Sequence, residues 1–404
     1  MRRVQTVANR TDFKTVQTSQ EELEEINEKV RRHRRKSFRN AAIIAAVLAV
    51  VIVGVQLWMA LRSYTAFEIR QITERKDSVA GKYESFAGNI LEYNNDGAVY
   101  HTTSNELIWN QSFEMATPEL DICEGYLAVY DRGGTFIYIM TAEGLVSRIE
   151  TSVPINRVCV ASQGTVAVLM KEDHVSYVRL YDRKGKELAN GKFYEEKGSF
   201  PVDIAFSTDG QKLAVNMLDV TKGKVRSSVS FYNFGSVGQN EIDNNVGSYS
   251  YDDVFISEIH YIDSDHVVAI GDNGLILFEG AQKPTPKKEV KFEQEVQSVF
   301  YNDKYVGITY SNSNKEESWH IKVYDMNGKT VMENDTGIAY DRIEFLENNE
   351  ICVRDEWNCE IFTIHSIRKF AYSFDKELYK ILSGADRQSY TFVMNGEIDE
   401  VRLR

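Results

Sequence analysis

The residue types that most often carry catalysis or metal binding are scattered along this chain. Its seven histidines stand at positions 33, 101, 174, 260, 266, 320 and 365, and none of them pairs at the spacing of metal ligands. Two acidic pairs, Asp252-Asp253 and Asp263-Ser264-Asp265, lie in polar segments that are typical of solvated turns. Gly133-Gly134 precedes no helical pattern, so it favours a hairpin over a phosphate loop. These positions predict no catalytic, cofactor-binding or metal-binding residue.

The four cysteines are equally dispersed, at positions 123, 159, 352 and 359, and none forms a C-x-x-C pair. A zinc site is therefore not expected. Cys352 and Cys359 could face each other across a hairpin that turns near Asp355-Glu356. A disulfide there and a pair of buried free thiols are both open, and the spacing of the other two cysteines favours free thiols.

Longer catalytic signatures are also missing from the sequence. It contains no D-x-[DN]-x-[DN]-G calcium loop and no G-x-S-x-G elbow. Glycosidases need two carboxylates held across a substrate, and a sequence alone cannot place such a pair. We therefore expect no cofactor and no enzymatic activity. Whether two carboxylates lie at the spacing of a glycosidase site is a question for the structure.

The apolar run Ala41–Leu61 decides on which side of a membrane these residues are expected. It has 21 residues and one clearly polar side chain, Gln56. A helix of that length spans roughly 30 Å, the thickness of a bilayer's hydrocarbon core. A cleaved signal peptide is the alternative, which the length of the run and the polar segment before it disfavour. The run predicts a single transmembrane helix.

Charge on the two flanks gives the predicted orientation. Residues 26–40 contain seven Lys/Arg and residues 62–76 contain four, so the N-terminus is expected inside the cytoplasm and the C-terminal part outside. Residues 1–40 carry 11 basic and 6 acidic residues, a net charge of +5. The remaining 36 basic and 54 acidic residues give −18. Such an acidic outer part argues against nucleic acid as a partner.

Four segments follow from these patterns: a basic cytoplasmic tail, 1–40; the transmembrane helix, 41–61; a connector, 62–84; and an extracytoplasmic domain, 85–404. Within the tail, residues 19–36 are predicted to be helical, because Ser19 and Glu22 form a capping box and acidic residues precede basic ones. This helix either docks a partner or simply extends the anchor.

Residues 85–404 show short apolar runs with turns every 8–12 residues, which indicates an all-β domain. A strand–turn–strand unit recurs at residues 101, 140, 181, 232, 278, 324 and 364, with spacings of 39 to 51 residues. That period is typical of four-stranded propeller blades. Pro118, Pro154 and Pro201 each precede a short apolar strand, which predicts the innermost strands of successive blades.

The number of blades follows less directly from the same units. Seven turn units favour seven blades, and three further strands near the C-terminus leave eight as the alternative. Those C-terminal strands are expected to close the ring by pairing with strands near Asn89–Phe113, because closure removes exposed sheet edges.

Two short motifs resemble known propellers. FSTDGQKLAV, from Phe206, is similar to the turn of bacterial WD40-like blades, and SNELIW, which ends at Trp109, is similar to the outer strand of quinoprotein-like blades. The whole arrangement resembles an uncharacterised bacterial family of single-pass, membrane-anchored propeller proteins, a domain of unknown function. The segments that carry this resemblance include YLAVYDRGGTFIYI and FYNFGSVGQNE. It implies a fold and a location, and no activity.

The sequence therefore predicts a membrane-anchored, extracytoplasmic β-propeller that acts as a non-enzymatic binding platform or sensor for a protein or a cell-envelope component. The alternative is an extracytoplasmic enzyme acting on sugar or envelope polymer. Carboxylates clustered at one end of the channel would favour the enzyme, and an apolar or aromatic face would favour the platform.

Overall fold

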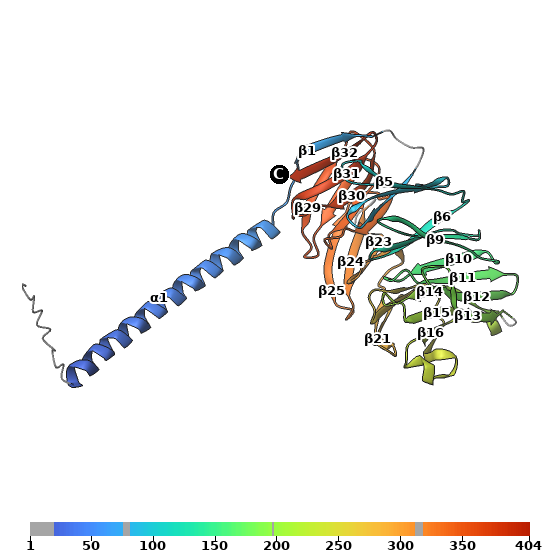
Figure 1. The fold of residues 1–404 in the computed structure, drawn as a ribbon, viewed down its shortest axis with the longest axis horizontal. Helices are drawn as coiled ribbons and strands as arrows, with labels where there is room; N and C mark the ends of the chain where they lie inside the picture. The colour runs from blue at the N-terminus through green and yellow to red at the C-terminus, as the bar shows by residue number, and fades with distance from the viewer. Residues whose placement is uncertain (1–19, 76–80, 196–197, 312–317) are drawn as a thin grey trace, which may run out of the picture. The chain divides into compact units, whose positions relative to one another are not determined.

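One long helix, thirty-two strands and three short 3₁₀ helices make up the regular structure of the described residues, which are 20–75, 81–195, 198–311 and 318–404. The computed structural model divides into two units, Met1–Arg62 and Ser63–Arg404. The helix lies in the first unit and all the strands lie in the second (Figure 1).

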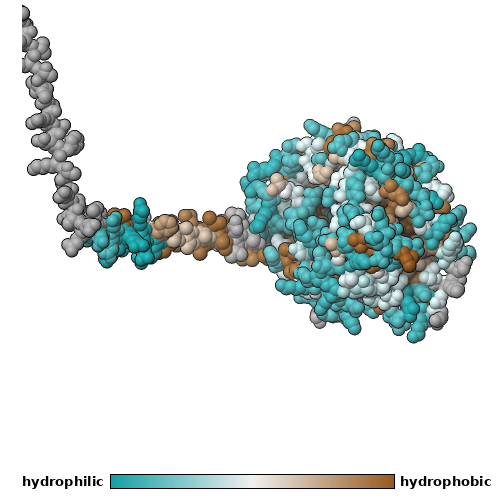
Figure 2. All heavy atoms as spheres, turned by 60° about the horizontal axis from the view of Figure 1, so that its bottom comes forward, coloured by the Kyte–Doolittle hydropathy of each residue, from teal (hydrophilic) through white to brown (hydrophobic). Residues whose placement is uncertain are grey.

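Helix α1 (Gln20–Ala60) is continuous over both the predicted tail helix and the predicted span, while Ser19 lies outside the described residues. Ion pairs one turn apart stabilise its polar half, with Lys29 Nζ 2.8 Å from Glu25 Oε1. Its apolar half appears as a hydrophobic stretch in Figure 2. By length and composition Asn27–Val55 is a candidate membrane span, although a signal sequence near an N-terminus has the same properties.

The strands form eight four-stranded antiparallel sheets, the blades of a propeller. Blade 1 contains β2 (Lys82–Phe86), β3 (Asn89–Asn94), β4 (Gly97–His101) and β5 (Leu107–Ser112). Blade 2 contains β6 (Pro118–Cys123), β7 (Tyr126–Asp131), β8 (Phe136–Thr141) and β9 (Gly144–Glu150). Blade 3 contains β10 (Ile155–Val160), β11 (Val166–Glu172), β12 (Val175–Tyr181) and β13 (Glu187–Tyr194). Blade 4 contains β14 (Ser199–Phe206), β15 (Lys212–Asp219), β16 (Arg226–Asn233) and β17 (Asn245–Asp252).

The second half of the ring continues in the same way. Blade 5 contains β18 (Ile256–Tyr261), β19 (His266–Gly271), β20 (Gly274–Glu279) and β21 (Thr285–Lys291). Blade 6 contains β22 (Val296–Tyr301), β23 (Tyr305–Ser311), β24 (Trp319–Asp325) and β25 (Thr330–Thr336). Blade 7 contains β26 (Arg342–Phe345), β27 (Ile351–Arg354), β28 (Asn358–Phe362) and β29 (Arg368–Ser373). Blade 8 contains β30 (Leu378–Ser383), β31 (Ser389–Met394), β32 (Glu397–Leu403) and, from the other end of the domain, β1 (Phe67–Glu74).

The propeller therefore has eight blades; the alternative of eight is confirmed and the preference for seven is wrong. Each of the seven turn units lies at the end of a third strand, where a hairpin leads to the fourth strand of blades 1–7. Blade 8 has no such hairpin, because its fourth strand, β1, comes from the N-terminal side. Counting hairpins therefore misses one blade.

Closure of the ring also differs from the prediction. Strand β32 pairs with β1, in a register that runs from Phe67 opposite Leu403 to Glu74 opposite Glu397, and does not pair with Asn89–Phe113. Those residues already form β3 to β5 of blade 1. Strand β1 lies inside the stretch 62–84 predicted as a connector, and its residues are mostly exposed. Apolar and polar residues alternate only from Phe67 to Arg70, because a bulge follows Ile69 and shifts the register. Most of the strand is also exposed, so this short alternation is a weak signal.

The core consists of apolar layers between neighbouring blades. Tyr100 of blade 1 packs in one cluster with Leu127 of blade 2, and Ile90 of blade 1 packs with Val393 of blade 8. The first strands of neighbouring blades contact one another, as β10 does β6 and β14, and β2 does β30. These first strands are thus the innermost ones, as the three prolines predicted, and they surround the central channel.

Candidate functional site

A β-bulge recurs in the inner strands and precedes polar side chains. In five blades the pairing of the first and second strands skips one residue, a β-bulge. Bulges re-aim the side chains that follow them. The residues that directly follow the skipped position are Arg157, Asp203, Glu258, Ser298 and Lys380. Four of the five carry a charge in an otherwise apolar strand context.

On one side of the channel, carboxylates of two blades flank an arginine. Arg157 Nε is 3.7 Å from Asp203 Oδ1. Asp121 Oδ2 accepts a hydrogen bond of 2.7 Å from the amide of Val160, and Asp203 Oδ2 accepts one of 3.0 Å from the amide of Ile259. Each carboxylate thus satisfies a backbone donor on the free edge of the next inner strand.

Burial raises the pKa of both Asp121 and Asp203, and the guanidinium of Arg157 opposes this rise. The carboxylates themselves raise the pKa of Arg157 against its own burial. Desolvation disfavours a charged carboxylate, and a cation beside it favours that form. Of the two terms, burial is the larger for both acids.

Next to this group, His260 and Tyr301 form the aromatic part of the channel wall. Their rings stack with centroids 3.9 Å apart, and His260 Nε2 lies 3.0 Å from Glu258 Oε2. That hydrogen bond lowers the pKa of Glu258. Tyr301 is 40% exposed, whereas His260 is buried. The tyrosine ring is therefore the surface that a bound molecule could contact.

On the opposite arc, blades 1, 7 and 8 are joined by a second charged group. Lys380 Nζ lies 2.7 Å from Glu84 Oε2 and 2.6 Å from Glu344 Oε2, while Arg342 pairs with the same two glutamates. Burial opposes the charged form of Glu84, but Lys380 and Arg342 hold its pKa below the ordinary value. Lys380 joins blade 8 to blades 1 and 7, and Arg342 joins blade 7 to blade 1, so this group helps to hold the ring closed.

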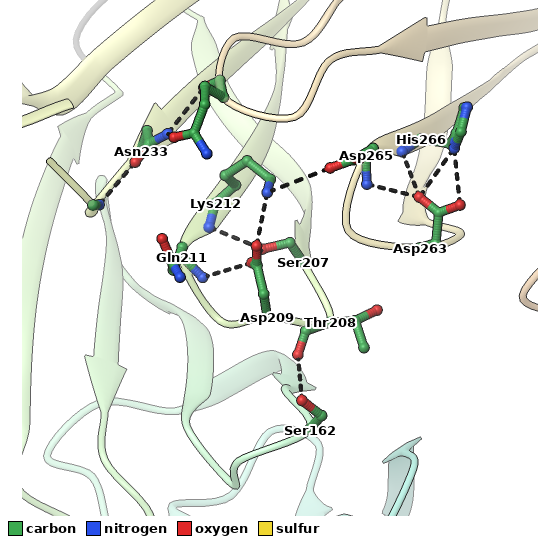
Figure 3. Close-up of polar contacts among 12 residues, drawn as sticks. Ser162, Ser207, Thr208, Asp209, Gln211, Lys212, Asn233, Asp263, Asp265 and His266 are labelled. Atoms are coloured by element: carbon green, nitrogen blue, oxygen red, sulfur yellow. Dashed lines mark hydrogen bonds and ion pairs between the residues drawn. The ribbon is translucent and has the colours of Figure 1, made fainter. Parts of the chain in front are cut away.

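The turns that follow the inner strands link blades 3, 4 and 5 (Figure 3). Ser207 Oγ donates to Asp209 Oδ1 at 2.5 Å, and the buried ammonium of Lys212 lies 2.9 Å from Asp209 Oδ2 and 4.0 Å from Asp265 Oδ1. Ser162 Oγ donates to the carbonyl of Thr208. This is the motif FSTDGQKLAV, and its polar residues shape turns and contact neighbouring blades.

The structure separates most of the residues that the sequence singled out. Asp252 pairs with Arg226, and Asp263 accepts hydrogen bonds from the amides of Asp265 and His266. Gly133 has a φ of 86° in the turn that the amide of Gly134 closes by donating to the carbonyl of Asp131, and its own amide donates to the carbonyl of Ile155 in blade 3. All of them support local structure.

The histidines are equally divided. His33, His174 and His365 are exposed, His101 is buried with a pKa lowered by that burial, and His260 alone lies with the channel residues. The two remaining histidines each contact one aspartate: His266 lies against Asp263, and His320 against Asp335. Among the residues described, no group of three histidine, cysteine or acidic side chains could hold a metal ion.

Cys352 and Cys359 do face each other across the hairpin of β27 and β28. Their sulfur atoms are 3.9 Å apart, both residues are buried, and all four cysteines are free thiols. Burial raises the pKa of Cys359 well above the ordinary value, which disfavours the thiolate. The two cysteines lie where the hairpin predicted. Of the two alternatives, a disulfide or buried free thiols, this structure has the free thiols.

Sequence reasoning missed the channel residues, although a signal was present. Asp121 and Arg157 each stand three positions after the proline that introduces an inner strand, and Asp203 stands two positions after Pro201. Pro201 itself lies inside β14 rather than before it. A charge that recurs two or three positions after a proline in an apolar strand indicates a shared environment, and here that environment is the channel.

Comparison with known proteins shows the family to which this sequence is similar. The sequence pattern of a family of unknown function (DUF5711) matches residues 60–403. No curated protein matches the sequence. Among solved structures, the Pan2 WD40 domain of Neurospora crassa is 10% identical with a TM-score of 0.42, over 71% of this chain and 88% of that one.

Two further structures are similar at the same level. A eukaryotic initiation factor is 12% identical with a TM-score of 0.48, over 82% of this chain and 91% of that one. Hsv2p of Kluyveromyces lactis is 6% identical with a TM-score of 0.45, over 83% and 98%. With TM-scores below 0.5, these likenesses carry no argument about function.

Proposed function

The chain belongs to the family of unknown function DUF5711, and on this premise we propose that it is a membrane-anchored binding platform without enzymatic activity. Helix α1 spans the membrane once, the tail is cytoplasmic, and the propeller lies outside. The Lys/Arg bias of the flanks, seven against four, supports this orientation. The partner is a protein or a component of the cell envelope.

The observation that carries the proposal is that the propeller begins, along the chain, within three residues of the end of helix α1. Helix α1 ends at Ala60, and Ser63 Oγ already donates to the carbonyl of Arg368 on β29. The amide of Tyr64 donates to the carbonyl of Lys369, and Phe67 begins the closing strand. A partner bound to the propeller would therefore be tethered to the membrane through a short stretch of chain.

Two measurements test this proposal in intact cells. A photo-crosslinking residue at Tyr301, in the channel wall, should give a discrete adduct with one partner, whereas the same residue at the exposed turn position Lys184 should not. Protease added outside, after removal of any outer membrane, should digest the propeller and spare the tail. Equal adducts at both positions, or a protected propeller, would contradict the platform or its orientation respectively.

The enzyme alternative keeps one specific observation in its favour. Asp121 and Asp203 lie near one arginine and both have raised pKa values, as a general acid requires. Against this, each accepts a backbone hydrogen bond that fixes it to the next strand. Hydrolysis of purified envelope polysaccharide by the full chain, abolished in Asp121→Asn, would favour the enzyme over the platform.

A further inference from the structure

A cavity of about 470 Å³ lies between the outer strands of blades 3 and 4. Its walls include Val178 and Leu180 of β12, Leu213 and Val215 of β15, and Tyr232 of β16. Ligand pockets usually have volumes of 300 to 1,000 Å³ and mainly apolar walls. The volume of this cavity lies within that range, and the residues around it belong to strands outside the inner ring, away from the central channel.

The repeat explains why the cavity exists. In each of blades 1–7 the third and fourth strands are offset by one residue at the same place. This shared offset aligns the fourth strands position by position. On each fourth strand, two residues that point to the same face follow this offset. In the order of blades 1 to 7 they are Trp109 and Gln111, Ser147 and Ile149, Ala189 and Gly191, Gly247 and Tyr249, Lys288 and Val290, Met332 and Asn334, and Phe370 and Tyr372.

Among these seven pairs, only the pair in blade 3 consists of two small residues. In blade 4 the position of Gly191 is held by Tyr249, whose ring packs on Phe231 and Phe278 with centroids 6.3 and 5.8 Å apart. The counterparts of Phe231 and Phe278 around the cavity are Leu180 and Tyr232, and both line it. The space thus corresponds to a missing tyrosine ring.

The rim of the cavity is polar. Asn190 and Lys192 of β13 and Asp243 and Asn244 of the 3₁₀ turn η3 (Ile242–Asn244) contribute donors and acceptors. Asp243 and Asn244 are held in left-handed backbone conformations, with φ of 54° and 58°. Aspartate and asparagine adopt this conformation more readily than other residues except glycine, and here it shapes the turn at the rim of the cavity.

We propose that this cavity binds an aromatic ring that carries a polar substituent, in the place that Tyr249 fills in the next blade. The apolar walls take the ring, and the rim takes the substituent. The proposal concerns a site apart from the channel and does not depend on the platform function. The ring is either a free small molecule or the side chain of a peptide.

The chain itself supplies the test, because Gly191→Tyr would restore the ring that blade 4 contains. Gly191 has no left-handed backbone, and an added Cβ would meet only Phe193 Cε2 at 3.6 Å and the carbonyl of Val178 at 3.9 Å. Leu188→Tyr is the matched control, since Leu188 is exposed on the same strand outside the cavity.

Binding of p-cresol and of the peptide Ala-Tyr-Ala to the full chain in nanodiscs would be measured by calorimetry. Wild type and Leu188→Tyr should bind at least one probe, and Gly191→Tyr should bind it at least ten-fold more weakly. Stronger binding of p-cresol indicates a free ligand, and stronger binding of the peptide indicates a side chain. No binding by wild type, or equal binding by Gly191→Tyr, would overturn the proposal.

A second variant guards against a folding defect. Ala189→Met places in blade 3 the residue that Met332 supplies at the same position of blade 6. It should reduce binding as Gly191→Tyr does, with an unchanged thermal midpoint. If Ala189→Met folds and binds as wild type does, the cavity is not the site.

Discussion

Blade 8 and blade 4 have the same four-stranded form but are held together differently. Blade 4 is one continuous stretch, β14 to β17, in which hairpins connect each strand to the next. Blade 8 takes three strands from the C-terminal part of the domain and the fourth, β1, from the residues that follow helix α1 in the chain. The difference means that side-chain and ladder contacts in blade 8 must supply what chain continuity supplies in blade 4.

Those contacts are concentrated where the first and last strands of the propeller, β1 and β32, meet. The amide of Arg404 donates to the carbonyl of Ala66, and Phe67 packs against Tyr372 and Phe392 with ring centroids 4.9 and 5.2 Å apart. Lys369, Glu350 and Tyr390 form a buried polar triad between blades 7 and 8. The stability of the closing blade therefore depends on these non-covalent contacts, because no hairpin joins β1 to β32.

The largest effect is expected when the closing strand is removed. Deleting Phe67–Glu74 leaves the edge of β32 exposed, and an open edge favours aggregation. Deleting Ser389–Arg404, which removes β31 and β32, should act in the same way. We expect loss of cooperative thermal unfolding, measured by circular dichroism, and aggregates on size-exclusion chromatography. Deletion of residues 2–15 is the control, and unchanged melting of either truncated domain would refute closure by β1.

The same comparison shows how far the sequence could predict the fold. The hairpins of blades 1–7 were visible as turn units, because a local turn leaves a local signal. The pairing of Phe67–Glu74 with Glu397–Leu403 joins segments more than 300 residues apart and involves a mostly exposed strand that alternates only over Phe67–Arg70. Nothing local in the sequence encodes that pairing, so the count stopped at seven.

The candidate site follows a similar rule. Pro118 and Pro154 correctly marked the inner strands, so the position of the channel was predictable. The pairing of Lys380 with Glu84, or of Arg157 with Asp203, depends on which blades become neighbours and on the bulges. The cavity of blade 3 was hidden because Ala189 and Gly191 are informative only when the register of all the blades is known.

A second, smaller effect is expected from the buried lysines on the two sides. Lys380→Met leaves Glu84 and Glu344 buried without that cation, which should cost about 4 kcal/mol of unfolding free energy. Lys212→Met in blade 4 leaves Asp209, whose side chain is one-third exposed, so a cost of about 1 kcal/mol is expected. Denaturant unfolding of both variants measures the difference. Equal costs would show that closure does not concentrate stability in blade 8.

A third effect concerns aromatic packing on the closing strand. Phe67→Ala removes four ring contacts and should cost about 3 kcal/mol. Tyr249→Ala in β17 is the matched change in blade 4. Because β1 is not tied to β32 by a hairpin, Phe67→Ala should also speed amide hydrogen exchange along the whole of β1. Exchange that increases equally in β1 and β17 would argue against a special role of continuity.

The smallest effect separates the blades by pH. Asp399 of β32 is buried, its Oδ1 has no hydrogen-bond partner, and burial raises its pKa to about 6. Since the folded state binds the proton more tightly than the unfolded chain, stability is greatest near pH 4 and falls as the pH rises through 6. Asp399→Asn should therefore raise the thermal midpoint at pH 8, by an amount equivalent to about 2 kcal/mol, and change little at pH 4.

Asp386 provides a control of opposite sign in the same blade. The amide of Gln388 and the guanidinium of Arg402 lower its pKa to about 2, so its contribution is present at neutral pH and is lost on acidification. Asp386→Asn should lower the midpoint at pH 8, where Asp399→Asn raises it. If both variants shift the midpoint in the same direction, the charge on Asp399 is not what limits the stability of the closing blade. Side-chain packing alone would then limit the stability of the β1–β32 pairing. Phe67 rather than Asp399 would be the residue whose contacts to strengthen.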